Sequence, residues 1–192
     1  MKKPASLITV SSPFPPESFY DLFDWLQPVW DKVSDDSSPT DREEFIEMQV
    51  AMAEMDTVKT WGVWKDHHEL GGFVSAQVQP LRPWLSVCHC TFKKSFWGTA
   101  TTLPALHAVA TELFEADIHK IEMWVFETNR AIRSLVKRLG GTEEGILTAQ
   151  TLKNGNPTSM VVYGLFPAGL VKMQEREGDA REGVATSYRI AV

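Results

Sequence analysis

The strongest constraint on the fold is a change of pattern between residues 84 and 114, where a β-rich segment gives way to a helix. The segment Trp84–Phe92 is rich in β-favouring residues, and a turn at Gly98 separates it from a helical stripe. Pro104 is compatible with a helix only near its start, so the helix begins close to the turn. A further β-rich segment at 118–127 completes a strand–helix–strand unit, which predicts a parallel pair of strands.

The same patterns predict the elements around this unit. Strands are expected at residues 6–10, 57–66, 72–80, 84–92, 118–127, 142–152 and 158–166, and helices at 17–32, 42–55, 103–114 and 129–141. The first two strands of the central run are joined by a turn at 67–72. Hairpins give antiparallel neighbours, so the sequence predicts an α/β (α+β) fold with a mixed, mostly antiparallel sheet and helices on its faces.

Residues that start or stop elements support these boundaries. Pro28 lies inside the first helical stripe and predicts a kink or an early end, because proline lacks the backbone N–H that a helix uses. Thr40 or Asp41 is placed to cap the second helix. Gly140 ends the last helix as a C-cap, and Asn154–Gly155 provides the turn of the final hairpin.

Composition excludes several classes of protein. Of the 192 residues, 43% are hydrophobic and 23% are charged, which are ordinary globular values. The net charge of −6 argues against a dedicated nucleic-acid binder, which would carry a basic surface. No segment approaches the roughly 18 apolar residues of a membrane span. The apolar run near the start is too short and broken for a secretory signal, so we expect a cytoplasmic protein with no membrane partner.

The cysteines and histidines do not predict a metal site. Cys88 and Cys90 are two residues apart in one strand, so they share a face and His89 points to the other. Direct neighbours at that spacing rarely form a disulfide, and reduced core cysteines are expected. His67 and His68 lie in a turn and lack partners for a metal, so they are expected in solvent.

The turn around Gly98 has the features of an anion site. A helix N-terminus presents unpaired N–H groups and a partial positive charge, and small residues such as Gly98 and Ala100 let a phosphate approach the backbone. The expected donors are the N–H groups of Trp97–Thr101, and the hydroxyls of Thr99 and Thr101 can add bonds. The alternative is that Gly98 only turns the chain.

The stretch from Ser86 to Phe166 resembles the C-terminal half of the GNAT N-acetyltransferases, closest to the branch that acetylates ribosomal-protein N-termini and polyamines. The resemblance rests on an ordered series of motifs. The series is "WGTA" before a long helix, "HKI" opening a strand, Asn129 before a helix that ends in glycine, "EEG", and a hairpin containing "NG". The earlier half of the chain matches only in the order of its elements.

The resemblance implies that acetyl-CoA binds where the strand 84–92 and the next strand splay apart. Backbone groups near Thr91 and Phe92 would pair with the pantetheine arm, and the turn at 97–101 would hold the pyrophosphate. Asn129 would hydrogen-bond the cofactor, although its position fits a helix N-cap equally well. The candidates for contacting the 3′-phosphate are Lys93, Lys94 and Arg133.

The catalytic half of the family pattern is less well kept. Leu135 stands where many members carry a tyrosine general acid, and Ile132 stands where some relatives use a serine. Ser134 lies nearby at neither position and is kept as a catalytic candidate. A base or a water chain must take the proton of the attacking amine. His89 is the best-placed titratable side chain for this, and its alternative is a histidine without a catalytic task.

The resemblance therefore predicts an acetyl-CoA-dependent N-acetyltransferase in which a primary amine attacks directly. The amine would belong to a protein N-terminus, a polyamine or another small molecule. The alternative is a catalytically weak or inactive GNAT-fold binding or regulatory module. The acids Glu43, Glu44 and Glu47 either attract a cationic amine or form a solvated helix face.

A single domain is expected over residues 1–166. Its acceptor half is 1–85 and its acyl-CoA half is 86–166. Residues 167–192 form a weakly patterned extension to which no element and no role is assigned, although it would suit an interaction with another protein. A homodimer is compatible with this organisation.

Overall fold

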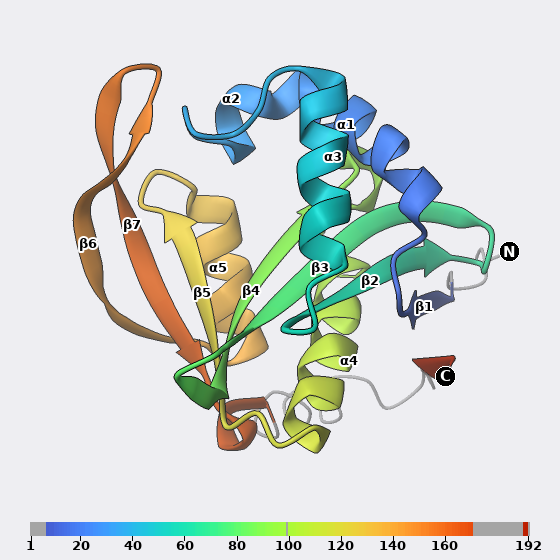
Figure 1. Cartoon of the computed structure of the whole chain (residues 1–192). Coiled ribbons are helices and arrows are strands. Elements are labelled where there is room, and N and C mark those ends of the chain that lie inside the picture. The colour runs from blue at the N-terminus through green and yellow to red at the C-terminus, as the bar shows by residue number, and fades with distance from the viewer. Residues whose placement is uncertain (1–6, 99, 171–189, 192) are drawn as a thin grey trace, which may run out of the picture.

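The computed structural model describes residues 7–98, 100–170 and 190–191. Its centre is an eight-stranded sheet in the order β6-β7-β5-β4-β3-β2-β1-β8 (Figure 1). The strands are β1 (Ile8–Ser11), β2 (Val58–Lys65), β3 (Glu69–Gln79), β4 (Arg82–Phe92), β5 (Lys120–Phe126), β6 (Thr142–Lys153), β7 (Asn156–Leu165) and β8 (Ile190–Ala191). The pairs β4–β5 and β1–β8 are parallel and the others are antiparallel, which confirms the mixed, mostly antiparallel sheet.

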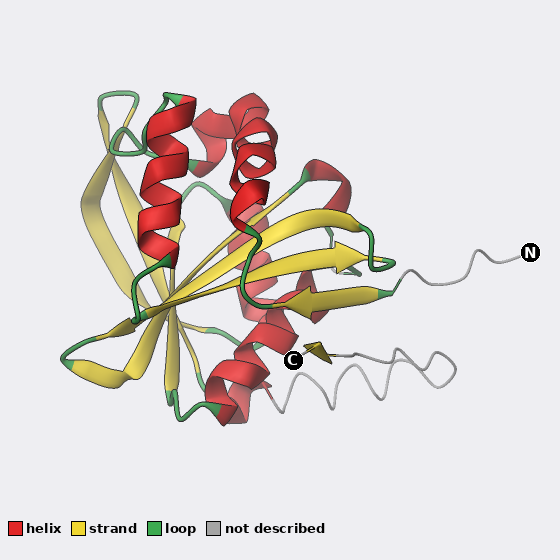
Figure 2. Ribbon diagram, turned by 45° about the vertical axis from the view of Figure 1, so that its right-hand side comes forward, coloured by secondary structure: helices red, strands yellow, loops and turns green. Residues whose placement is uncertain are grey.

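Helices cover both faces of this sheet (Figures 1 and 2). They are α1 (Phe19–Leu26), α2 (Trp30–Val33), α3 (Arg42–Ala53), α4 (Thr102–Glu115) and α5 (Arg130–Leu139), with 3-10 segments η1 (Pro16–Ser18), η2 (Gln27–Val29) and η3 (Lys94–Phe96). We call the side with α1, α2 and α3 the α3 face and the side with α4 and α5 the α4 face. Within the described residues, no helix is long and apolar enough to cross a bilayer.

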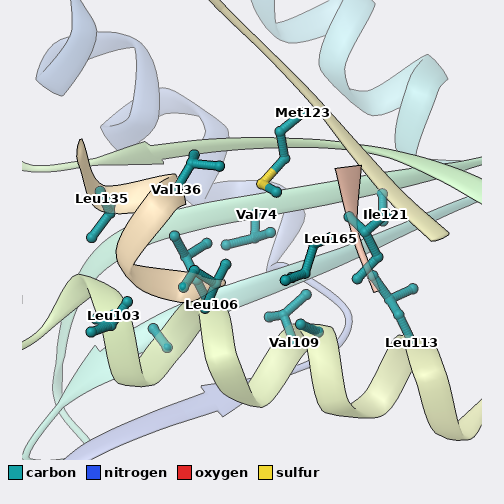
Figure 3. Packing of buried hydrophobic residues seen from close by; sticks show 14 of the residues in the cluster. Val74, Leu103, Leu106, Val109, Leu113, Ile121, Met123, Leu135, Val136 and Leu165 are labelled. Atoms are coloured by element: carbon teal, nitrogen blue, oxygen red, sulfur yellow. The ribbon is translucent and has the colours of Figure 1, made fainter. Parts of the chain in front are cut away.

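The larger hydrophobic core lies on the α4 face. Figure 3 shows α4 side chains, among them Leu106 and Val109, directed at Val74 of β3 and Leu165 of β7, with Val136 of α5 beside them. All five side chains are buried or nearly so. Because burial of an aliphatic side chain contributes about 1.5–3 kcal/mol, this layer fixes α4 and α5 against the central strands.

A second, aromatic cluster lies on the α3 face. The ring of Phe73 makes edge-on contacts with the rings of Phe14 and Phe19, whose centroids lie 4.8 and 5.7 Å from the Phe73 centroid. Its neighbour Val74 belongs to the other core, as the alternation of side chains along a strand requires. The side chain of Phe73 therefore identifies the α3 face of β3, and the side chain of Val74 identifies its α4 face.

The expected helix boundaries are confirmed where the signal is local. Pro28 lies in η2, which interrupts the helical stripe between α1 and α2, so the predicted kink is present. Asp41 caps α3, because its Oδ1 accepts from the N–H of Glu44 at 3.1 Å. Gly140 ends α5 with a left-handed φ of 104°, and Asn154–Gly155 turns the β6–β7 hairpin with φ of 51° and 70°.

The turn predicted at 67–72 was placed too far along the chain. The turn occupies residues 66–68, and β3 already begins at Glu69, so Gly71 and Gly72 lie inside the strand. A Cβ on Gly71 would overlap the ring of Phe96, and one on Gly72 would come within 2.7 Å of the ring of Phe92. Because the two glycines have no side chains, they leave room for the rings of Phe96 and Phe92.

Beyond Pro167 the structure shows two short pieces that the sequence pattern does not predict. Residues 167–170 form a helical turn, and β8 adds to the edge of β1, where Val10 pairs with Ile190 in parallel. The segment 171–189 lies outside the described residues. The division into a domain at 1–166 and an extension at 167–192 stays a prediction.

Candidate active site

The parallel strands β4 and β5 stay paired over only a short distance. Their register runs from Leu85↔Lys120 to Val87↔Glu122. Beyond these positions β4 continues as Cys88–Phe92 and β5 as Met123–Phe126, and the two diverge (Figure 1). We call the region between these two segments the β4–β5 opening. It is the splayed pair that the resemblance implies.

Two hydrogen bonds show which backbone groups of β4 point into the opening. The N–H of Lys93 donates to the carbonyl of Gly71 in β3 at 2.8 Å, so Lys93 is directed away from β5. The carbonyl of Trp84 accepts from the N–H of His119 at 2.8 Å, so Trp84 is directed toward β5. Backbone direction alternates along a strand, and the two observations agree on the same alternation.

The backbone groups of Cys88, Cys90 and Phe92 therefore face the opening. Thr91, which the sequence paired with the pantetheine arm together with Phe92, is opposite Phe73 and directs its backbone toward β3. Each such residue offers one donor and one acceptor, so this edge of β4 can pair with an extended amide-bearing ligand as a neighbouring strand would.

The same reasoning applies to β5 across the opening. Glu127 donates its N–H to the carbonyl of Ser159 at 3.0 Å, which directs the backbone of Glu127 toward the β7 side. By alternation, Trp124 and Phe126 direct theirs toward β4. The carbonyl of Phe126 already accepts from the N–H of Asn129 at 2.8 Å. The opening is thus lined by main-chain groups on both sides.

Trp97 closes one end of this edge. Its indole Nε1–H donates to the carbonyl of Phe92 at 2.7 Å, although half of the residue (51%) is exposed to solvent. Phe92 is one of the two residues whose backbone groups the resemblance assigned to the pantetheine arm. An incoming ligand that needs this acceptor has to displace the indole.

The loop from Trp97 to Thr101 supports an anion site in part. Trp97 donates its N–H to Lys94, and Thr101 donates its N–H to Gly98, so these two expected donors are already used. Gly98 and Ala100 supply the other described N–H groups, and Thr99 lies outside the described residues. Gly98 has a φ of 128°, which side chains rarely adopt, and apart from its chain neighbours no heavy atom of the described residues lies within 4 Å of a Cβ built on it.

The start of α4 is built into this loop. Thr102, which is buried, donates through Oγ1 to the carbonyls of Phe96 and Gly98 at 3.1 and 2.8 Å. Thr101 occupies the N-cap position and makes no capping bond through its side chain. The open space at Gly98 and the uncapped helix terminus fit a phosphate group there.

Phe96 and Lys93 attach the loop to neighbouring elements. The Phe96 ring is 1% exposed and packs on Gly71 of β3, while Lys93 places its Nζ 5.3 Å from the ring centroid of Trp25 in α1. The loop is therefore attached both to the sheet and to the first helix. Lys94 is exposed beside it.

Asn129 is observed as a helix cap. Its Oδ1 accepts from the N–H of Ile132 at 3.2 Å at the start of α5, and its role toward a cofactor stays a prediction. Arg133 is held by several acceptors: Tyr163 Oη and the Glu127 carbonyl, each at 3.1 Å, and Glu143 at 3.5 Å. Arg133 thus has a structural role in joining α5 to β6 and β7.

The two proposed catalytic side chains are not brought together. His89 projects from β4 on the α3 face, opposite Ser75. Ser134 is exposed on α5, which covers the other face, and its helical position is opposite the buried Val136 and Leu139. Leu135 fills the core where a tyrosine acid would be expected. Of this pair, only His89 lies beside the opening.

The surroundings of His89 favour its neutral form. The residue is exposed, yet the protein around its imidazole displaces enough water for desolvation to lower the pKa below the ordinary value. Burial also raises the pKa of the Cys90 thiol to about 11 and that of Cys88 further, and both free cysteines pack against the larger core. These thiols are therefore protonated and unreactive in the folded protein.

The sequence reasoning missed a set of side chains on β5. Glu122, Trp124 and Phe126 alternate with the core residues Met123 and Val125, so they project together onto the α3 face. We call these three residues the β5 strip. The alternation is visible in the sequence and could have identified the strip, because a charged and two aromatic residues share one side of a strand that ends at the opening.

A clamp between distant segments borders the strip. Asp36, in the loop after α2, accepts from the N–H groups of Asn154 and Gly155 through Oδ1 and Oδ2, both at 2.7 Å. Lys153, next to that turn, donates to the carbonyl of Ser34 at 3.2 Å. A cavity of about 330 Å³ lies between this loop, η2, α2 and the tip of the β6–β7 hairpin. We call the Asp36 contacts the Asp36 clamp.

One polar atom near the end of the strand pairing is left without a partner. Ser86 is fully buried on the α4 face, and within the described residues its Oγ has no hydrogen-bond partner. A group that can accept or donate a hydrogen bond is needed there. Among the described residues, no group of three or more His, Cys, Asp and Glu side chains is arranged to hold a metal ion.

No family model matches the chain. Its structure is similar to that of RimJ from Mycobacterium smegmatis in complex with a CoA disulfide, with a TM-score of 0.76, 16% identity and 91% of each chain covered. It is similar to RimL, the ribosomal L7/L12 α-N-protein acetyltransferase in complex with coenzyme A (TM-score 0.72, 17% identity, 85% of this chain and 96% of that one). It is also similar to a chimera of the spermidine N-acetyltransferase SpeG from Vibrio cholerae (TM-score 0.74, 14% identity, 86% and 99% covered).

These similarities identify the fold as that of the GNAT acetyltransferases. The fold class expected from the sequence is confirmed by them.

Proposed function

We propose that the protein is an acetyl-CoA-dependent N-acetyltransferase that acts on a primary amine. The observation that carries the proposal is the β4–β5 opening, in which backbone groups of two parallel strands face a common space next to the glycine turn that starts α4. An extended ligand with amides and a phosphate at one end matches both parts.

The residues that would hold the cofactor follow from this geometry. The backbone groups of Cys88, Cys90 and Phe92 would pair with the amides of the pantetheine arm. The N–H groups of Gly98 and Ala100 would hold the pyrophosphate, where the absence of a Cβ on Gly98 leaves room. These assignments use main-chain atoms, so they depend on the path of the backbone more than on residue type.

Bound acetyl-CoA supplies a thioester whose acetyl group is transferred to the amine. His89, neutral because desolvation lowers its pKa, accepts the proton that the amine loses as the N–C bond forms and the C–S bond breaks. N–H groups on the edge of β4 stabilise the charge that develops on the carbonyl oxygen. No acid is needed to release the sulfur, because a thiol of pKa about 8.5 leaves readily as a thiolate.

Two of the similar proteins are named for amine substrates, a ribosomal-protein N-terminus and spermidine. Both present a primary amine on a narrow chain. We carry over to this protein only that shared group, because the acceptor side of the opening is made by its own side chains.

Calorimetry with acetyl-CoA tests the proposal, using substitutions at Gly98. Gly98→Glu places a carboxylate at the phosphate position and should reduce affinity at least 100-fold. Gly98→Gln has the same size and the same backbone strain without the charge, so it should lose less. Equal losses in the two variants would show that backbone strain alone explains the effect. No binding by the unmodified protein at millimolar acetyl-CoA would remove the proposal.

A second candidate function is a CoA-binding module without turnover. The observation in its favour is that Leu135, which is buried, and Ile132 stand where relatives place a general acid, while the nearby Ser134 is exposed to solvent. A thiol-release assay with acetyl-CoA and N-terminal peptides, polyamines or aminoglycosides separates the two functions. Binding without release on any of these amines would favour the module.

A further inference from the structure

The β5 strip begins where the pairing of β4 and β5 ends. Glu122 is the last residue of β5 that pairs with β4, and its partner is Val87. Trp124 and Phe126 follow Glu122 beside the opening, with their side chains on the same face. His89 projects on that face from β4, two residues beyond Val87. In Figure 1 no described helix crosses the front of β5 and β7. An amine that reaches the opening from the α3 face therefore meets Glu122.

The carboxylate of Glu122 is held in one orientation. Its Oε1 accepts from Trp124 Nε1 at 2.6 Å, and its Oε2 accepts from Lys120 Nζ at 3.3 Å. The side chain is only 16% exposed, so its charge is weakly screened by water. A carboxylate has about four acceptor positions, and these contacts use two of them. Acceptor capacity remains for a ligand N–H.

Lys120 does not neutralise this site fully. The same ammonium lies 2.6 Å from Glu144 Oε2, closer than it lies to Glu122. Burial opposes the charge of Lys120, but the hydrogen bonds that its ammonium donates to Glu144 and Glu122 outweigh this effect and raise the pKa of Lys120. The three groups together carry a net charge of −1, from two carboxylates and one ammonium.

The protein itself places a primary ammonium over one ring of the strip. Lys153, which reaches over from the β6–β7 hairpin, places its Nζ 4.1 Å from the ring centroid of Phe126. A lysine side chain is a primary amine on a methylene chain, so it represents the chemistry of the proposed acceptor. A cation over an aromatic ring is favourable at this distance. Trp124, 36% exposed, presents a second ring between Phe126 and Glu122.

We propose that Glu122 positions the acceptor and restricts it to amines with no carboxylate next to the reacting nitrogen. The inference rests on the proposed function. The ammonium passes the exposed ring of Trp124 and donates an N–H to Glu122. It gives one proton to water to become a neutral amine, and His89 accepts the second proton as the N–C bond forms. An α-carboxylate on the substrate would lie against the negative charge of Glu122 and be repelled.

Two matched substitutions and two matched substrates test this inference. Glu122→Gln keeps the acceptor for Trp124 and removes the charge. Glu144→Gln removes the same charge from the same lysine, but on β6, two strands away from the opening. The substrates are alaninamide and alanine, which differ in the carboxylate. Steady-state thiol release at saturating acetyl-CoA gives kcat and KM, and calorimetry gives the affinity for CoA.

The protein should acetylate alaninamide in preference to alanine. Glu122→Gln should raise the KM for alaninamide about tenfold, with kcat changed less than about threefold, because one charge-assisted hydrogen bond is lost. It should also reduce the preference for alaninamide over alanine about tenfold. Comparing this ratio between variants cancels the difference in intrinsic reactivity of the two amines. Glu144→Gln should have a clearly smaller effect on both quantities, because it leaves the Glu122 carboxylate and its free acceptor positions in place.

Several results would overturn the inference. For the variants, these results are equal effects of the two substitutions and an unchanged preference in Glu122→Gln. For the unmodified protein, they are equal use of alanine and alaninamide, and binding of CoA without acetylation of either amine. Failure to bind CoA at all would instead overturn the proposed function. Unchanged CoA affinity in both variants separates an effect on the acceptor from a general loss of structure.

Discussion

The edge of β4 and the β5 strip face the same opening but offer a ligand different things. The edge of β4 and the loop before α4 offer main-chain donors and acceptors, placed by a glycine, a strand pairing and a helix start. The β5 strip offers side chains, and the ring of one of them, Phe126, lies beside the ammonium of Lys153 from the β6–β7 hairpin. A backbone site tolerates changes of residue type, whereas a side-chain site changes with each substitution. The first suits a constant cofactor and the second a variable acceptor.

The largest effect expected from this comparison is at His89. His89→Gln should lower kcat at least 100-fold, because general base catalysis typically contributes about 100- to 10,000-fold, while CoA affinity stays the same. Desolvation lowers the pKa of His89, so the acidic fall in kcat/KM should lie below about pH 6.5 and be absent from the variant. A profile that is unchanged in His89→Gln would assign the base elsewhere.

The same pKa has a consequence for stability. A histidine whose pKa is lowered by folding binds protons more weakly in the folded state than in the unfolded state. The free energy of unfolding should therefore fall as the pH drops below the unfolded-state pKa of about 6.5. Above that pH, His89 is neutral in both states and does not change the free energy of unfolding. Denaturant titrations of the protein and of His89→Gln at several pH values measure the difference.

Gly71→Ala tests how firmly the β4 side depends on packing. The new Cβ would overlap the Phe96 ring, so the ring and the loop above it must move, at a cost of about 1–3 kcal/mol. Thermal denaturation should show a lower Tm and calorimetry a weaker affinity for CoA. Gly145→Ala is the control, because no heavy atom lies within 4 Å of its Cβ. Equal behaviour of the two variants would contradict the role of Phe96.

The smallest effect is expected at Trp97. Trp97→Phe removes the N–H that occupies the Phe92 carbonyl, so CoA should bind about fivefold more tightly, which corresponds to one ordinary hydrogen bond of about 1 kcal/mol. Adenosine 3′,5′-bisphosphate lacks the pantetheine arm and should bind both forms equally. Weaker binding of both ligands would show instead that the indole forms part of the cofactor site.

The sequence could predict the order of the elements because each signal is local. The break at Pro28, the cap at Asp41 and the hairpin turn at 154–155 each depend on neighbours in the chain. The strand–helix–strand unit with Gly98 between its parts likewise led to the parallel pair and to the loop before α4.

What the sequence could not predict depends on contacts between distant residues. Gly71 resembles a turn residue until Phe96 is seen to occupy the space above it. The position of Ser134 on the outer side of α5 follows only from which helix face meets the core. Lys120 bridges Glu122 and Glu144, and the sequence contains no signal that pairs these two carboxylates through one lysine.

The Asp36 clamp makes two exposed turns interdependent. The carboxylate of Asp36 accepts hydrogen bonds from both N–H groups of a turn more than a hundred positions later in the chain. If either turn is replaced by another sequence, the remaining turn loses these hydrogen bonds. Grafting the hairpin tip of a relative onto this scaffold would therefore succeed only if the loop after α2 were transferred with it. Over evolutionary time, insertions in one turn would be expected to follow changes in the other.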